Sequence, residues 1–329
     1  MYFGNSFDSA KLLFATIGVS FAFIKVSVYS MIGLFTHSKE EHNSFMSSIE
    51  GFFMVGIASA YFLFPAFFDT QNHDAWLRVY LLLAGLIALA FLLLLFSRVD
   101  VPIPKNEGSL KDDFTGMIRL IVLPLVLFFV LSAFLFVMVE QGIMTWLPTF
   151  NQNVLSLNPT LSVQMASILA LSLALGRFVA GQIVKYISWV KLLTLCLLAA
   201  MAIVAFVLPQ ALTYHSDPIH SVIDIPLIGY VFPLIGLFIS PVYPLISSAT
   251  LSALPQRMHS AMTGMIVIFS ALGGTLGSRI IGMLFEHVGG AQAFYFMIVP
   301  ITLLIITLWL LDRSINRYEA AHPVEQQAG

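Results

Sequence analysis

Apolar residues occur in nine long stretches, which short polar segments separate from one another. A bilayer core about 30 Å thick needs roughly 20 apolar residues in a helix, because every backbone polar group must be paired within the segment. The pattern therefore predicts an all-α, polytopic membrane helix bundle with about nine transmembrane helices. The expected spans run about 11–35, 45–68, 76–97, 117–149, 161–187, 190–210, 224–254, 258–286 and 291–311.

The spans fall into three blocks of three helices, over residues 11–97, 117–210 and 224–311. The longest hydrophilic stretch predicts a boundary between two bundles. We expect a three-helix remainder of an N-terminal bundle at 1–97, a cytoplasmic linker at 98–116, a six-helix bundle at 117–311 and a cytoplasmic tail at 312–329. Secondary transporters pair three-helix repeats into six-helix halves. The unpaired first block therefore leads us to expect that a first three-helix unit is absent, through natural truncation, a misplaced start codon or a gene fragment.

The distribution of Lys and Arg among the loops predicts the orientation in the membrane, since cytoplasmic loops are enriched in both. The opposite set of connections, with the N-terminus, holds only Lys11 and Arg78. We therefore expect the C-terminus to be cytoplasmic, in a multi-pass protein of the plasma (inner) membrane. The loops assigned to the cytoplasm hold ten basic residues: Lys39, Arg98, Lys105, Lys111, Arg119, Lys185, Lys191, Arg257, Arg313 and Arg317.

Composition excludes several functional classes. Hydrophobic residues make up 59% of the chain and charged residues 10%, with a net charge of -2, so neither a soluble surface nor a nucleic-acid partner is expected. The single cysteine, Cys196, excludes an intrachain disulfide, and no His pair has metal-ligand spacing. No nucleotide-binding or hydrolase motif occurs. We expect no cofactor, no metal and no enzymatic activity, since a membrane-embedded enzyme would need clustered His, Asp or Ser at one depth.

Two charged residues lie deep within predicted spans. Lys25 lies about 21 Å along its helix from Lys11, and Glu140 about 15 Å from Phe150, at 1.5 Å per residue. A charge near the bilayer centre costs about 2.5–3.5 kcal/mol on insertion scales, which makes each a candidate for function. The two could pair or share a solute. Two other interpretations stay open: Lys25 in a structural ion pair or near the inner headgroups, and Glu140 as the outer end of an apolar run.

Three further charged residues lie near span ends. For two of them a structural role is the favoured interpretation, and for the third the sequence does not decide between structure and function. Arg177 is within two or three turns of the inner surface, so snorkelling or helix packing explains it. For Glu50, a salt bridge to a cytoplasmic Lys or Arg is the favoured interpretation over transport chemistry. Arg279 can reach the outer headgroups, and the sequence favours neither a structural nor a functional role for it.

The seventh span, "GYVFPLIGLFISPVYPLISSAT", is interrupted by prolines, including Pro241 and Pro244. Proline leaves backbone carbonyls without a helical hydrogen bond. Inside a membrane, such carbonyls are tolerated only where other parts of the protein or water supply a hydrogen bond. Hydroxyl residues along one stripe, Ser240, Tyr243, Ser247 and Thr250, suit a polyhydroxylated solute. The alternative is a kinked gate helix whose hydroxyls bond to their own backbone.

The next span carries Gly273 and Gly277 in a small-xxx-small pattern, which favours close helix packing and suits rocking motion.

Three segments resemble the major facilitator superfamily. "LALGRFVAGQIVKYISWVKLL", "GLFISPVYPLISSATLSALP" and "GMIVIFSALGGTLGSRIIGMLFEHVGG" are similar to helices 8, 10 and 11 of its fucose, galactose and glucose/proton symporter branch. "FVMVEQGIMTWLPTF" is similar to that branch's helix 7, and the first span then corresponds to helix 4. The chain differs in having Lys25 where that branch usually has an acid, and a looser basic loop after helix 8, with Lys185 and Lys191.

The resemblance implies a secondary active transporter. It would move a small polar solute, a sugar or sugar acid, by alternating access. It would act as a monomer in the lipid bilayer and be coupled to an ion, most simply a proton. The alternative is a truncated membrane fragment that does not transport. Candidate substrate-binding or coupling residues are Lys25, Tyr29, Glu140, Gln141, Trp146, Ser240, Tyr243 and Ser247, with Pro241, Pro244, Gly273 and Gly277 in packing or gating.

Overall fold

A computed structural model describes residues 6–35, 39–69, 71–72, 74–97, 120–213, 219, 221–255 and 258–322. Within these residues, nine helical segments are long and apolar enough to cross a membrane, which confirms the predicted all-α bundle. The first three spans contain α1 (Phe7–Phe35), α2 (Lys39–Leu63) and α3 (Val79–Phe96). Two short 3₁₀ turns, η1 (Pro65–Phe67) and η2 (Ala75–Arg78), lie between α2 and α3.

The remaining spans begin with α5 (Pro124–Asn153), α6 (Pro159–Ile183) and α7 (Trp189–Thr213). The 3₁₀ turn η3 (Val222–Asp224) precedes the seventh span. The chain ends with α11 (His259–Val288), α12 (Gly290–Tyr295) and α13 (Ile298–Ala321). The last helix continues beyond the predicted span end at residue 311, because its polar residues, such as Arg313, are compatible with helix outside an apolar layer.

Local sequence signals account for several helix ends. Pro124 and Pro159 occupy the first turns of α5 and α6, where a missing N–H removes no helical hydrogen bond. The side chain of Asn158 caps α6 by accepting a hydrogen bond from the Leu161 N–H at 2.9 Å. Gly289 ends α11 with a φ of 93°, a conformation that side chains disfavour.

The seventh span is broken, as its prolines predict. It consists of α8 (Leu227–Val231), the 3₁₀ turn η4 (Phe232–Leu234), α9 (Ile235–Ile239) and α10 (Val242–Ala253). Pro233 lies in η4, and Pro241 precedes α10. Each proline removes a backbone donor, so regular helical bonding cannot continue through it.

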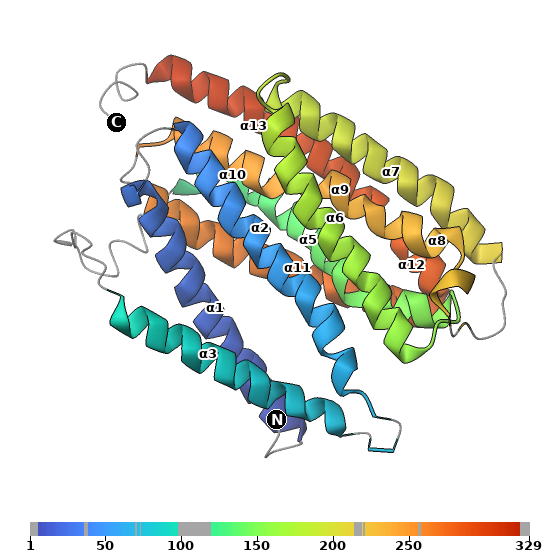
Figure 1. Ribbon diagram of the computed structural model, residues 1–329. Helices are drawn as coiled ribbons and strands as arrows, with labels where there is room; N and C mark the ends of the chain where they lie inside the picture. The colour runs from blue at the N-terminus through green and yellow to red at the C-terminus, as the bar shows by residue number, and fades with distance from the viewer. Residues whose placement is uncertain are drawn as a thin grey trace.

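Helix α5 lies at the centre of the packing, in contact with α6, α10, α11 and α13. Helix α2 packs along α6, and α1 contacts both α2 and α11. Figure 1 shows α2 between α1 and α6. The largest fully buried side chains include Phe129, Phe136, Phe150, Phe232 and Phe294.

Helices α1 and α3 expose mainly apolar side chains, among them Phe14, Phe23, Leu94 and Phe96. Such surfaces suit contact with acyl chains, which are as apolar as leucine. The predicted linker at 98–116 lies outside the described residues, as does the end of the predicted tail from residue 323.

Candidate transport site

Four charged side chains form a connected cluster inside the predicted membrane spans. Arg177 donates a hydrogen bond from Nη1 to Glu50 Oε2 at 2.7 Å, and from Nη2 to Glu140 Oε1 at 3.2 Å. Lys25 Nζ lies 3.8 Å from Glu50 Oε1, which extends the cluster to a fourth residue. We call these four residues the charge cluster.

Each member of the charge cluster comes from a different helix. Lys25 is on α1 and Glu50 on α2, within the first block of three helices. Glu140 is on α5 and Arg177 on α6, within the following block. The guanidinium of Arg177 therefore connects acids from the two blocks, and its Nη1 also donates to the backbone oxygen of Glu50 at 3.3 Å.

The cluster is buried and electrically balanced. The side chains of Arg177, Glu50 and Glu140 are 2%, 7% and 8% exposed, whereas that of Lys25 is 17% exposed. With all four groups ionised, the two cations and two carboxylates have no net charge. Opposite partners at hydrogen-bonding distance offset the cost of removing the charges from water.

The ammonium of Lys25 also contacts aromatic rings. Its Nζ lies 4.8 Å from the ring centre of Tyr243 and 5.5 Å from that of Phe21, distances at which a ring face attracts a cation. Tyr243 in turn packs against Phe136 of α5, with ring centres 6.0 Å apart. The broken seventh span thus reaches the charge cluster through Tyr243.

The predicted hydroxyl stripe is buried. Ser240 lies between α9 and α10, and Tyr243, Ser247 and Thr250 lie on α10, all at most 4% exposed. The side-chain oxygens of Ser240, Ser247 and Thr250 have no hydrogen-bond partner within the described structure. These three hydroxyls therefore do not bond to their own backbone, as the alternative of a kinked gate helix required. Buried hydroxyls without partners are uncommon and require an explanation.

Three other candidates differ in their surroundings. Trp146 packs against α11: its Nε1 donates to the Ser278 backbone oxygen at 2.7 Å, and its ring stacks on Phe285 with centres 5.3 Å apart. Gln141 lies beside Gly274, where an added Cβ would be 3.1 Å from Gln141 Cγ. The side chain of Tyr29 lies outside the described part of the chain.

The glycines of α11 allow close helix packing. A Cβ at Gly273 would collide with the backbone oxygen of Phe134, and one at Gly277 with that of Met138. Gly176, next to Arg177, allows α6 to pack closely against the seventh span. A Cβ at this position would collide with the Leu237 backbone oxygen and Ser240 Oγ. Of the two candidate prolines, Pro241 caps α10 and Pro244 lies in its first turn.

The structure shows the partners of two charges that the sequence placed near span ends. Arg177 does not snorkel: its side chain is buried and paired with two acids. Glu50 forms salt bridges with Arg177 and Lys25, which lie within spans. Lys25 and Glu140 are connected through Glu50 and Arg177. Arg177 and Glu50 were not among the candidate site residues. The signal that could have identified them is a charge within an apolar stretch. Arg279 is exposed.

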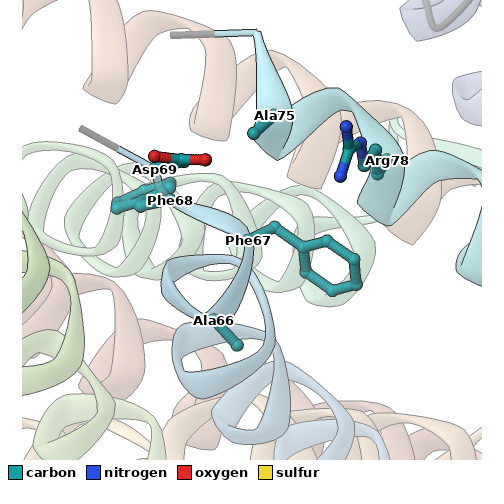
Figure 2. Close-up of a pocket in the computed structure, with 6 residues that line it drawn as sticks. All are labelled: Ala66, Phe67, Phe68, Asp69, Ala75 and Arg78. Carbon is teal, nitrogen blue, oxygen red and sulfur yellow. The ribbon is translucent and has the colours of Figure 1, made fainter. Parts of the chain in front are cut away.

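Two hollows at the end of α2 lie apart from the charge cluster. One, of about 390 Å³, is lined by Phe67, Phe68, Asp69 and Arg78 among others, and Figure 2 shows Asp69 and Arg78 on its opposite sides. A larger groove of about 630 Å³ has an almost wholly apolar lining that includes Tyr61 and Trp76. Among the described residues, no group of three His, Cys, Asp or Glu side chains could hold a metal ion.

A bundle of membrane-spanning helices with a charge cluster shared between its helix blocks is typical of membrane transport proteins. The sequence matches the family model of the Major Facilitator Superfamily over residues 2–278. The chain belongs to the Major Facilitator Superfamily, a family of secondary transporters. Among curated proteins, none matches its sequence.

Solved structures share the fold. A crystal structure of a variant of the E. coli fucose:proton symporter FucP matches with a TM-score of 0.64 and 14% identity, over 88% of this chain and 73% of that one. FucP in an outward conformation matches with a TM-score of 0.63, 15% identity and 88% and 72% coverage. A bacterial homologue of the human lysosomal transporter Spinster, inward-facing and unoccupied, matches with a TM-score of 0.51 and 15% identity. The match covers 83% of this chain and 66% of that one. At these identities the likeness concerns the fold.

Proposed function

We propose that this chain is an ion-coupled secondary transporter that moves a small polar solute, a sugar or sugar acid, by alternating access. The observation that carries the proposal is the charge cluster, in which Arg177 pairs with an acid from each helix block inside the membrane span. The likeness to FucP, described as a fucose:proton symporter, supports this class of solute and a proton as the coupling ion.

Stability alone is a poor reason for such a cluster. Well-packed apolar residues can replace a buried ion pair without loss of stability, and each unpaired charge at the bilayer centre costs about 2.5–3.5 kcal/mol. Four charges on four helices fit a site whose pairing changes during a cycle. Glu140 takes the role of titrating acid, since protonation would weaken its bond to Arg177 Nη2.

Alternating access requires the helix blocks to move against each other. Arg177 connects α6 to α2 through Glu50, so this pair would have to separate or rearrange as the path opens on that side. Arg177 lies six residues before the end of α6, about 9 Å along the axis, which the predicted orientation places in the cytoplasmic half. The pair would then close the path toward the cytoplasm.

The hydroxyls of α10 would form the solute-binding face. Ser240 and Ser247 are buried without hydrogen-bond partners, and a polyhydroxylated solute supplies such partners. The proline breaks on either side of α9 give this span the irregular backbone that lines transporter paths.

Uptake by the purified protein in proteoliposomes tests the proposal. We expect a labelled hexose or hexuronate to accumulate when the outside is acidified, and not when a protonophore removes the gradient. The Glu286→Gln variant, which changes an exposed acid of α11, is the matched control and should keep uptake. Absence of uptake of every sugar and sugar acid under all gradients overturns the proposal.

A further inference from the structure

We propose that the end of α2 nearest α3 binds a phospholipid with an ammonium headgroup, of the phosphatidylethanolamine class. The inference is carried by the two hollows at this end of the helix, one lined by charged side chains and the other apolar. The site lies apart from the charge cluster, so the proposal does not depend on the identity of the transported solute.

The two hollows adjoin and differ in polarity. Phe68 lines both of them, so they meet at this residue. The smaller hollow, of about 390 Å³, contains Asp69 and Arg78, whereas the groove of about 630 Å³ has an almost wholly apolar lining. Both volumes lie within the range of about 300–1,000 Å³ that is typical of ligand sites. One amphiphilic molecule can therefore place its polar end in the first and an apolar chain in the second.

The order of the hollows along α2 follows the change from water to hydrocarbon. Asp69 and Arg78 lie in the connection after α2, which the distribution of basic residues assigns to the outer side of the membrane. The groove extends back to Ile57, six residues before the end of α2, which is about 9 Å along the helix axis. Tyr61 and Trp76 line the groove, and both residue types are enriched at membrane interfaces. A lipid with its headgroup outward and an acyl chain inward fits this order.

The two charges of the polar hollow match a zwitterion. Figure 2 shows Asp69 and Arg78 on opposite sides of the hollow, and both side chains are exposed. These two described side chains form no ion pair with each other. Asp69 Oδ1 accepts a hydrogen bond from the Gln71 backbone N–H at 2.8 Å, which helps to orient the carboxylate. A guanidinium binds phosphate through paired N–H donors, and a carboxylate accepts hydrogen bonds from an ammonium group. A phosphoethanolamine headgroup supplies both partners on one short spacer.

The groove has walls from both helix blocks. Phe64 and Trp76 line it, and their rings pack against Tyr80 of α3 with ring centres 6.4 and 5.9 Å apart. Val163 of α6 also lines the groove, and η1 contacts α6 beside it. An acyl chain in the groove would have van der Waals contact on several sides, whereas a chain of the surrounding bilayer meets the protein on one side. A lipid bound here therefore contacts both helix blocks.

Native mass spectrometry of the purified, delipidated protein in detergent tests the assignment. We expect phosphatidylethanolamine to bind about fivefold more tightly than phosphatidylglycerol with the same acyl chains, because only the former offers a cation to Asp69. Glycerophosphoethanolamine, which has the headgroup without the chains, should not compete at concentrations where the lipid binds. Equal binding of the two lipids overturns the assignment, and so does competition by the soluble headgroup that is as strong as that of the lipid.

Charge removal locates the headgroup. Arg78→Gln and Asp69→Asn should each weaken phosphatidylethanolamine binding about fivefold, and Asp69→Asn should also abolish the preference over phosphatidylglycerol. Arg279→Gln and Asp224→Asn change exposed charges on the same predicted outer side, and as matched controls they should leave binding unchanged. Binding that neither change in the hollow weakens overturns the proposal. The comparison of lipids on the unaltered chain decides the question even if a variant does not fold.

A bulky side chain in the groove locates the acyl chain. Ala60→Trp places an indole in the space that the chain would occupy, so we expect phosphatidylethanolamine binding to weaken about fivefold. Ser59→Trp, at the neighbouring exposed position outside the groove lining, is the matched control. Equal binding by the two variants overturns the placement of the chain in this groove.

Discussion

Arg177 on α6 and Glu50 on α2 are 127 positions apart in sequence, yet Nη1 and Oε2 lie 2.7 Å from each other in a buried environment. The pair connects α6 to α2, and these two helices pack along each other. The second guanidinium nitrogen, Nη2, donates a hydrogen bond to Glu140 on α5. One arginine therefore links three helices.

The Arg177→Gln variant should be strongly destabilised, because it leaves two buried carboxylates with less positive charge. Breaking a buried ion pair from one side costs about 3–5 kcal/mol. Thermal unfolding in detergent measures the loss, with Arg313→Gln, an exposed arginine on α13, as the control. The double variant Glu50→Gln with Arg177→Gln should unfold at a higher temperature than Arg177→Gln alone. If Arg177→Gln is as stable as the unaltered protein, the pairing does not support the fold.

The Glu140→Gln variant should separate transport from coupling. The amide oxygen can still accept the hydrogen bond from Arg177 Nη2, but the group can no longer bind and release a proton. We expect uptake to become insensitive to an imposed pH gradient, while exchange of labelled for unlabelled solute continues. Accumulation that still follows the pH gradient would assign coupling to a different group.

The Ser247→Ala variant should weaken solute binding without loss of stability. Its hydroxyl is buried without a partner, which costs about 1–3 kcal/mol, so its removal should leave the unfolding temperature unchanged or higher. The KM for solute should rise, because a hydrogen-bonding group is lost. Paired unfolding and uptake measurements check both effects, and an unchanged KM would remove Ser247 from the site.

The Gly277→Ala variant should weaken the contact between α11 and α5. A Cβ would collide with the Met138 backbone oxygen, and such overpacking costs about 1–3 kcal/mol. Gly181→Ala is the matched control, since a Cβ at Gly181 meets nothing within 4 Å. Equal unfolding temperatures for the two variants would mean that these helices separate at little cost.

The Trp146→Phe variant distinguishes packing from solute binding. It loses the hydrogen bond to the Ser278 backbone oxygen while it keeps an aromatic ring, so we expect a loss of about 1 kcal/mol in unfolding free energy. The KM for solute should not change. A several-fold increase in KM without loss of stability would return Trp146 to the binding site.

The sequence establishes the fold class, because membrane helices need long apolar runs and nine such runs occur along it. It also predicted the broken seventh span, since proline cannot donate a helical hydrogen bond, and the close packing at Gly273 and Gly277. Lys25 and Glu140 were recognisable because a charge deep in an apolar run is costly wherever the other helices lie.

Which charges meet depends on the tertiary structure. Hydrophobic patterning indicates that a helix crosses the membrane, but pairing depends on its depth, its rotation about its axis and the identity of its neighbour. Arg177 looked like a residue near a helix end, and it became the centre of the cluster only because α2 packs along α6 and brings Glu50 to it. The pairs at sequence separations of 127 and 37 residues come from helix packing, about which neighbouring residues in the sequence carry no information.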